Sequence, residues 1–136
     1  MFKFIHAADF HLDSAFGALT ARQAAQRRTE SRELADRLAD YVNCHGVELV
    51  LLAGDLFDSA DPFRETGERL AAALGRMRAA VFAAPGNHDW YGPGSPWRTI
   101  SWPENVHVFT RPVMETVEVP GLGVTVSGAA FTGPDQ

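Results

Sequence analysis

The chain has 136 residues, enough for one domain with a real hydrophobic core. Its formal net charge is −5 at pH 7, so no overall positive field attracts nucleic acid, and contact with DNA would need local patches or a partner. The single cysteine, Cys44, excludes an internal disulfide and a cysteine-based zinc site. Because no apolar run approaches about 18 residues and the N-terminal residues lack the pattern of a secretory signal, we expect a cytoplasmic, non-membrane protein.

The first predicted strand covers residues 2–8 and leads into Asp9-Phe10-His11. Asp9 and His11 are two residues apart, so both side chains project to the same side if the extended backbone continues. A long helix is expected over residues 20–45, ended by Gly46. Its predicted apolar stripe consists of Leu34, Leu38, Tyr41 and Val42.

The apolar run over residues 49–53 predicts a strand buried on both faces. It stops at Gly54-Asp55, and a second carboxylate, Asp58, follows three residues later. A second helix is expected over residues 61–78, with Leu70, Leu74 and Met77 on its buried side.

A third strand is expected over residues 80–84, followed at once by Pro85-Gly86 and then Asn87-His88-Asp89. Residues 92–103 are rich in proline and glycine and predict an irregular surface loop containing Trp97 and Trp102. Three antiparallel strands are expected after it, over residues 106–109, 113–119 and 124–126.

This order of elements predicts one α/β domain over residues 1–136, with no internal boundary. A β-α-β-α-β unit forms a parallel sheet through right-handed crossovers, and the later strands add antiparallel pairs on one side. The carboxyl ends of parallel strands are where open α/β sheets bind ligands. The polar residues after the three strands are therefore expected to share one site.

The residue types in these clusters are carboxylate, imidazole and amide, a ligand set suited to Mn, Fe, Zn or Mg. A central Asp can bridge two cations, and a pair about 3.5–4 Å apart can clamp a phosphoryl group. Each residue alone has an ordinary explanation as a helix cap or turn residue. It is the ordered set of three clusters that favours a metal site.

The order Asp-x-His, Gly-Asp and Gly-Asn-His-Asp resembles the calcineurin-like metallophosphoesterase superfamily. Within it, residues 4–13, 53–58 and 103–108 resemble the bacterial SbcD-type DNA repair exonuclease subunit. The resemblance covers essentially the whole chain and roughly the first third of a family member. It implies one half of a four-layer α/β/β/α sandwich.

The resemblance also implies the roles of six residues: Asp9, His11, Asp55 and Asn87 as metal ligands, and His88 and Asp58 as catalytic residues. Asp55 would bridge the two ions. His88 would face the scissile phosphate and protonate the leaving oxygen, with Asp58 orienting its ring. Asp89 is expected to play a structural part behind the ligands.

The implied cofactors are two divalent ions, with Mn²⁺ favoured by the resemblance and Fe or Zn as alternatives. The implied partners are DNA and an SbcC-type ATPase subunit. The family's remaining ligands, a histidine and then a Gly-His-x-His pair, have no counterpart in this sequence, so this chain alone is expected to be weakly active or inactive. Two alternatives stay open: a non-catalytic fragment or scaffold with an incomplete metal site, and a small-molecule phosphodiesterase.

Two surface features have open interpretations. The arginines of the first helix could contact phosphate or could pair with nearby acids on a solvated face, which we favour: Arg22, Arg27, Arg28, Arg32 and Arg37. Trp90 and Tyr91, directly after the site, are candidates for substrate contact. An uncovered sheet face and an open edge also favour self-association into a homo-oligomer.

Overall fold

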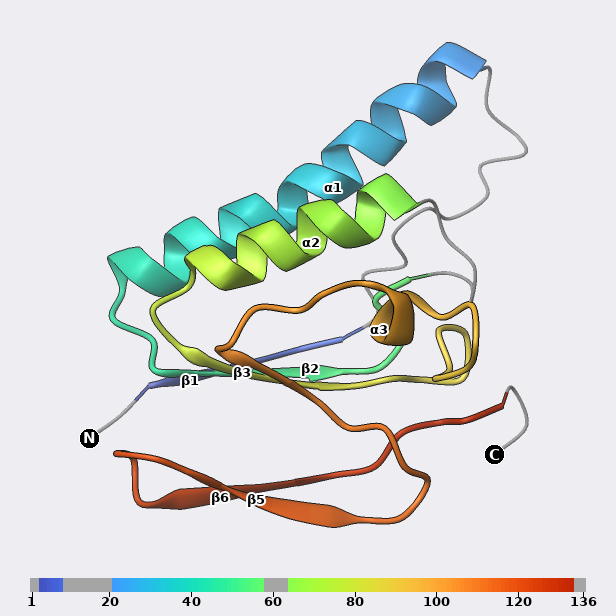
Figure 1. Cartoon of the computed structure of the whole chain (residues 1–136). Coiled ribbons are helices and arrows are strands. Elements are labelled where there is room, and N and C mark those ends of the chain that lie inside the picture. The colour runs from blue at the N-terminus through green and yellow to red at the C-terminus, as the bar shows by residue number, and fades with distance from the viewer. Residues whose placement is uncertain (1–2, 9–20, 58–63, 134–136) are drawn as a thin grey trace.

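The computed structural model describes residues 3–8, 21–57 and 64–133, and shows a parallel sheet covered by helices on one face and by a hairpin on the other (Figure 1). The elements in chain order are β1 (Phe4–Ala7), α1 (Ala21–Cys44), β2 (Leu49–Ala53), α2 (Arg64–Arg76), β3 (Ala80–Ala84), α3 (Pro96–Thr99), β4 (Val106–Val108), β5 (Glu115–Val119) and β6 (Val124–Gly128). The predicted mixed α/β fold with a parallel start and later antiparallel strands is confirmed.

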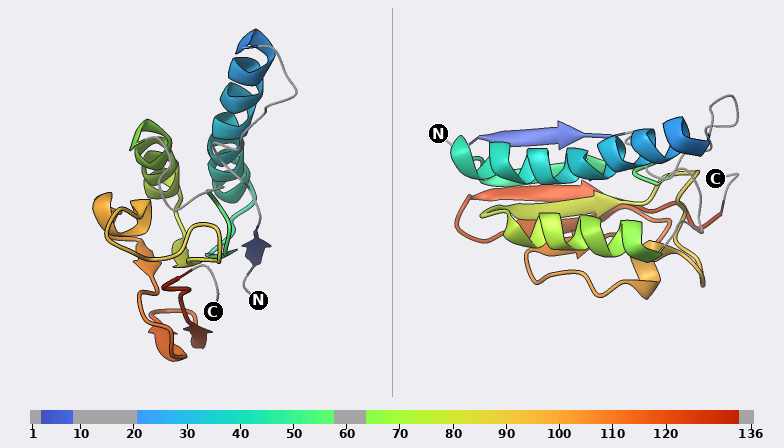
Figure 2. Two further views of the ribbon diagram at one scale, coloured as in Figure 1. Left: turned by 90° about the vertical axis from the view of Figure 1, so that its right-hand side faces the viewer. Right: turned by 90° about the horizontal axis from the view of Figure 1, so that it is seen from above.

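The main sheet has the strand order β1-β2-β3-β4, and every neighbouring pair is parallel. Each strand therefore ends at the same edge of the sheet. Right-handed crossovers that advance in one direction place their helices on the same face, and α1 and α2 indeed lie side by side there (Figures 1 and 2). The opposite face is left to β5 and β6, which form a separate antiparallel pair.

The expectation that residues 106–109 form an antiparallel strand is wrong. β4 pairs in parallel with β3, with Val81 opposite Val106. The segment between them is long enough to return from the end of β3 to the start of β4, and it contains α3, which begins at the N-cap Ser95. This segment therefore serves as a third crossover, although its proline and glycine content resembles that of an irregular loop.

The core has two parts because the sheet is buried on both faces. Between the sheet and the helices lie Val42, Val50, Leu52, Leu70, Leu74 and Val81. Beneath the other face, Leu49 and Phe82 pack with Phe109 and Val119 near the hairpin. Burial on both sides explains why β2 is an uninterrupted apolar run rather than an alternating one.

The buried stripe of α1 differs from the predicted one. Leu34 and Tyr41 are 40% and 51% exposed, whereas Ala35, Ala39 and Val42 are buried. Small alanines allow the helix backbone to approach its neighbours closely, so the contact face is rotated toward them. The predicted stop is confirmed: Gly46 adopts φ 64°, and the N–H of Val47 donates to Val42 O at 3.0 Å.

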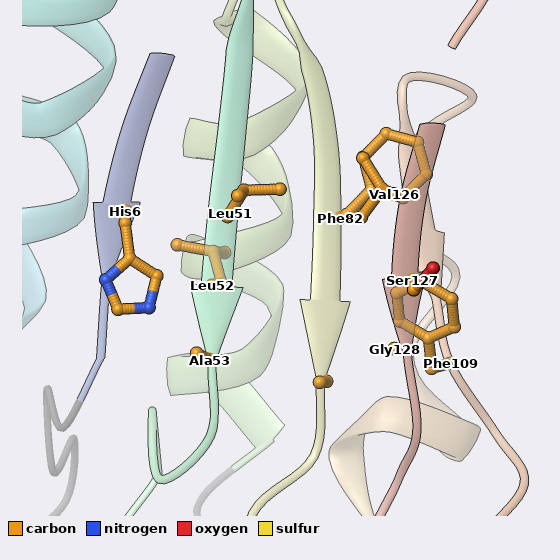
Figure 3. A pocket seen from close by; sticks show the side chains of 10 residues that line it. His6, Leu51, Leu52, Ala53, Phe82, Phe109, Val126, Ser127 and Gly128 are labelled. Carbon is orange, nitrogen blue, oxygen red and sulfur yellow. The ribbon is translucent and has the colours of Figure 1, made fainter. Parts of the chain in front are cut away.

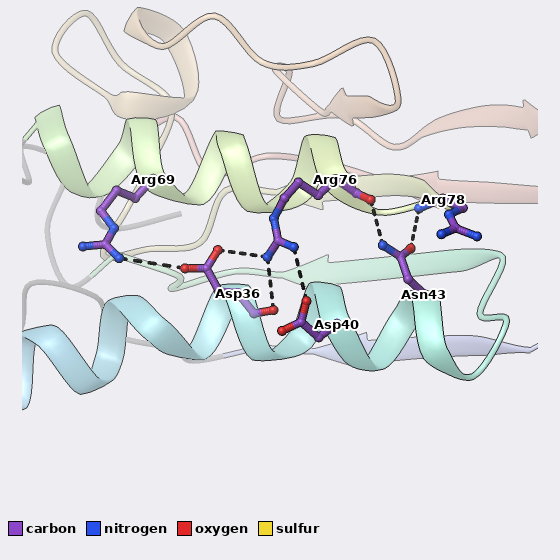
Figure 4. Close-up of polar contacts among 6 residues, drawn as sticks. All are labelled: Asp36, Asp40, Asn43, Arg69, Arg76 and Arg78. Carbon is purple, nitrogen blue, oxygen red and sulfur yellow. Dashed lines mark hydrogen bonds and ion pairs between the residues drawn. The ribbon is translucent and has the colours of Figure 1, made fainter.

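Polar contacts fix the register of α1 against α2 (Figure 4). The Arg76 guanidinium pairs with Asp40 at 3.2 Å and Asp36 at 3.1 Å, and these hydrogen bonds raise the pKa of Arg76. Asn43 donates to Arg76 O and accepts from Arg78 N. Arg37 pairs with Glu33 at 3.7 Å within α1, as the solvated-face interpretation of the arginines predicts.

A cavity of about 200 Å³ lies between the lower face of the sheet and β6 (Figure 3). His6 and Leu51 line it from the sheet, and Phe109 and Val126 line it from the opposite side. The hairpin thus leaves part of this face uncovered near β1, where Phe4 is 58% exposed. Among the described residues, no helix combines the length and apolar composition needed to cross a membrane.

Candidate metal centre

The candidate site lies where the loops that follow β2 and β3 touch. Gly54 and Asp55 both have positive φ, at 79° and 54°, which turns the chain sharply at the end of β2. Because Gly54 and Gly86 both lack a side chain, the two backbones approach so closely that a Cβ on Gly54 would lie 3.2 Å from Gly86 Cα. A left-handed conformation is uncommon for an aspartate, and here it accompanies the placement of the carboxylate at the sheet edge.

Asp55 is the centre of the described contacts. The backbone N–H of His88 donates to Asp55 Oδ1 at 2.9 Å, and His88 Nδ1 lies 3.5 Å from Oδ2. The Asp55 side chain is 16% exposed and the His88 side chain 50% exposed. The imidazole is therefore open to a substrate, whereas the carboxylate lies deeper.

The Asn87 amide lies against the same carboxylate. One of its terminal atoms is 3.3 Å from Asp55 Oδ1 and 3.1 Å from Oδ2. With nitrogen on that side, Asn87 donates to the carboxylate. With oxygen on that side, three oxygen atoms converge, which is the donor set that Mg²⁺ or Mn²⁺ takes. The residues present thus fit a divalent cation.

Half of the predicted site residues fall outside the described part of the chain. Asp9, His11 and Asp58 are among them, so their predicted roles stay predictions. Asp55, Asn87 and His88 are brought together as expected from their positions at strand ends. Within residues 3–8, 21–57 and 64–133, no three His, Cys, Asp or Glu side chains gather around a possible metal position.

Asp89 is fully buried, and its carboxylate accepts hydrogen bonds from both loops rather than lining the site. One of its donors is the indole N–H of Trp97. Trp97 is only 3% exposed and stacks on Trp102 at a centroid distance of 4.9 Å. The prediction of a surface loop was therefore wrong for Trp97, which packs beneath the site.

A cavity of about 230 Å³ opens at the site, lined by Asp55, Asn87 and two residues that sequence reasoning missed, Ala129 and Phe131. The N–H of Phe131 donates to Pro85 O, which holds the segment after β6 against the loop after β3. No motif marks these residues. The only signal is that an antiparallel return from β6 brings the chain back to the same sheet edge.

A parallel β-α-β-α-β unit with Asp, Asn and His side chains at adjoining strand ends is what a phosphoesterase domain requires. Residues 2–131 match the family model for calcineurin-like phosphoesterases. The match covers nearly the whole chain, and the chain belongs to this family.

Two curated proteins from Bacillus subtilis (strain 168) are similar to the chain. The uncharacterized metallophosphoesterase YhaO is 39% identical over 118 residues, which cover 82% of this chain and 28% of YhaO. The SbcD subunit of the nuclease SbcCD is 24% identical over 140 residues, covering 98% of this chain and 34% of that protein. The chain thus spans about a third or less of these relatives.

Proposed function

We propose that the chain takes part in metal-dependent phosphodiester hydrolysis, with DNA ends as the substrate. The observation that carries the proposal is the convergence of Asp55, Asn87 and His88 in one cavity at the ends of β2 and β3. β1 lies beside β2 and ends at Ala7, two residues before Asp9. Asp9 and His11 would supply the ligands of the first ion, Asp55 would bridge, and Asn87 would bind the second.

Bound divalent cations would neutralise the phosphate and supply a nucleophile at neutral pH. His88 would donate a proton to the departing sugar oxygen, which its exposed ring at the cavity mouth allows. Asp58 would orient that ring, and Asp55 lies 3.5 Å from its Nδ1. Phe131 forms an apolar wall of the same cavity, against which a sugar or base could pack.

The finer parts of the proposal are supported by the relative named as a nuclease component. They are Mn²⁺ as the metal, a role in DNA repair, an SbcC-type ATPase as the partner and the cytoplasm as the location. The alternative is a scaffold without catalysis, which the coverage of only 28% to 34% of the relatives favours. A small-molecule phosphodiesterase would act on model diesters but not on DNA.

The Asp55→Asn variant tests the metal site. We expect the chain to take up Mn²⁺ in a titration followed by electron paramagnetic resonance, and the variant to bind it at least tenfold more weakly, because the bridging charge is lost. Hydrolysis of bis(p-nitrophenyl) phosphate and of end-labelled duplex DNA should fall in parallel.

The matched control is Asp40→Asn, the same chemical change on α1 at a side chain 74% exposed. Its Mn²⁺ affinity should equal that of the parent chain. A parent chain that binds no Mn²⁺ and cleaves neither substrate would support the scaffold instead. Cleavage of the model diester without cleavage of DNA would support the small-molecule phosphodiesterase.

We also propose that a second copy of the chain covers the open part of the sheet face near β1. The cavity beneath the sheet and the exposed ring of Phe4 leave apolar surface there, and such surface favours association. Light scattering at micromolar concentration should give the mass of a dimer. A single species with the mass of one chain would contradict this.

A further inference from the structure

We infer that Asp89 is a positioning residue: its buried carboxylate clamps the loop carrying Asp55 to the loop carrying Asn87 and His88, and thereby sets the metal geometry. The inference rests on the proposed function of the same site. Asp89 itself is 0% exposed. It acts through backbone groups of both loops and through one side chain of α3.

The first oxygen of Asp89 joins the two loops directly. Oδ1 accepts from the backbone N–H of Asp55 at 3.0 Å and from that of Gly86 at 2.7 Å. One donor belongs to the proposed bridging residue, and the other precedes Asn87 by one position. A single oxygen atom thus fixes the distance between the two ligand-bearing backbones.

The second oxygen secures the turn after β2. Oδ2 accepts from Leu56 N at 3.0 Å, from Phe57 N at 3.3 Å and from the indole Nε1–H of Trp97 at 3.0 Å. Three N–H groups in succession, those of Asp55, Leu56 and Phe57, therefore point at one carboxylate. These bonds hold the backbone where Asp55 adopts its left-handed conformation.

The five N–H donors require an acceptor on both sides, which only a carboxylate provides. An asparagine keeps one oxygen and replaces the other with an NH₂ group, so two or three donors would face another donor. A buried N–H without a partner costs free energy, and the loops would move apart to reach water. Asp89→Asn is therefore the sharpest test, since it changes no volume.

Nuclear magnetic resonance of the ¹⁵N-labelled chain without metal provides the first measurement. We expect the amides of Asp55, Leu56 and Gly86 to shift and to exchange with solvent at least tenfold faster in Asp89→Asn. The milder variant Trp97→Phe removes one donor to Oδ2 and keeps an aromatic ring, so it should perturb mainly Leu56 and Phe57.

Mn²⁺ affinity provides the second measurement. The dissociation constant should rise at least tenfold in Asp89→Asn and two- to fivefold in Trp97→Phe. The matched control is Asn105→Ala, because Asn105 is also a polar hub, donating to Leu74 O and Ala79 O, but its partners lie at the opposite end of the sheet. That variant should lose stability and keep its Mn²⁺ affinity.

The outcomes separate the inference from the proposed function. Mn²⁺ affinity equal to that of Asn105→Ala would overturn the positioning role; if Asp89→Asn does not fold, Trp97→Phe decides on the same criterion. Unchanged amide exchange in Asp89→Asn would overturn it as well. If the parent chain takes up no Mn²⁺, the proposed metal site fails, and the inferred control of metal geometry fails with it. The amide data would still show whether Asp89 clamps the loops.

Discussion

Replacing Gly86 with alanine should destabilise the domain by about 3 kcal/mol and separate the two loops of the site. The added Cβ would lie 2.5 Å from Asp55 Oδ1 and 2.6 Å from Asp55 N, so backbone atoms and not only a flexible side chain would have to move. Gly86 does not have a positive φ, so the effect arises from close approach rather than from backbone strain. Urea denaturation followed by circular dichroism measures the loss.

The control for this variant is Gly94→Ala. Gly94 is exposed, and nothing lies within 4 Å of a Cβ built there. Its substitution should leave stability unchanged or raise it by a few tenths of a kcal/mol, because alanine restricts the unfolded chain. A Gly86→Ala protein as stable as Gly94→Ala would show that the loops can separate without loss, and the close contact would then have no structural importance.

Replacing His88 with alanine should slow DNA hydrolysis by about 10²–10³-fold, the usual contribution of a general acid. Hydrolysis of bis(p-nitrophenyl) phosphate should fall far less, because its leaving group departs without a proton. The His88 side chain is 50% exposed and has no part in the core, so thermal stability should change little. Rates of both substrates with Mn²⁺ at saturating concentration separate the two effects.

His45→Ala is the control, since His45 lies at the opposite end of the sheet and stacks on Tyr41. It should leave both rates unchanged. An equal loss on DNA and on the model diester in His88→Ala would contradict the role of proton donor. It would indicate instead that His88 binds the phosphate or supports a ligand.

The sequence predicts the local elements well because their signals are short in range. The stripe of Leu70, Leu74 and Met77 is buried as expected. The spacing of the polar clusters at strand ends correctly brings Asp55, Asn87 and His88 together, since parallel strands end at one edge. The metal roles of these residues, and those of Asp9, His11 and Asp58, stay predictions.

Other features depend on segments far apart in the chain. The direction of β4 follows from how the preceding segment packs, and not from its composition. The wall formed by Phe131 depends on the return of the chain after β6. The face of α1 that is buried depends on how closely alanines let it approach its neighbours.

By itself, the sequence determined the order of strands and helices and the set of polar residues that the strand ends present. Periodicity and glycine stops act over a few residues, so they can be read without the fold. Only the tertiary structure decided that Gly86 must lack a side chain and that Asp89 lies buried between two loops, accepting the N–H of Asp55 from 34 residues away. The reason is that hydrogen bonds and steric contacts across neighbouring strands depend on distances in space, which the spacing of residues along the chain does not contain.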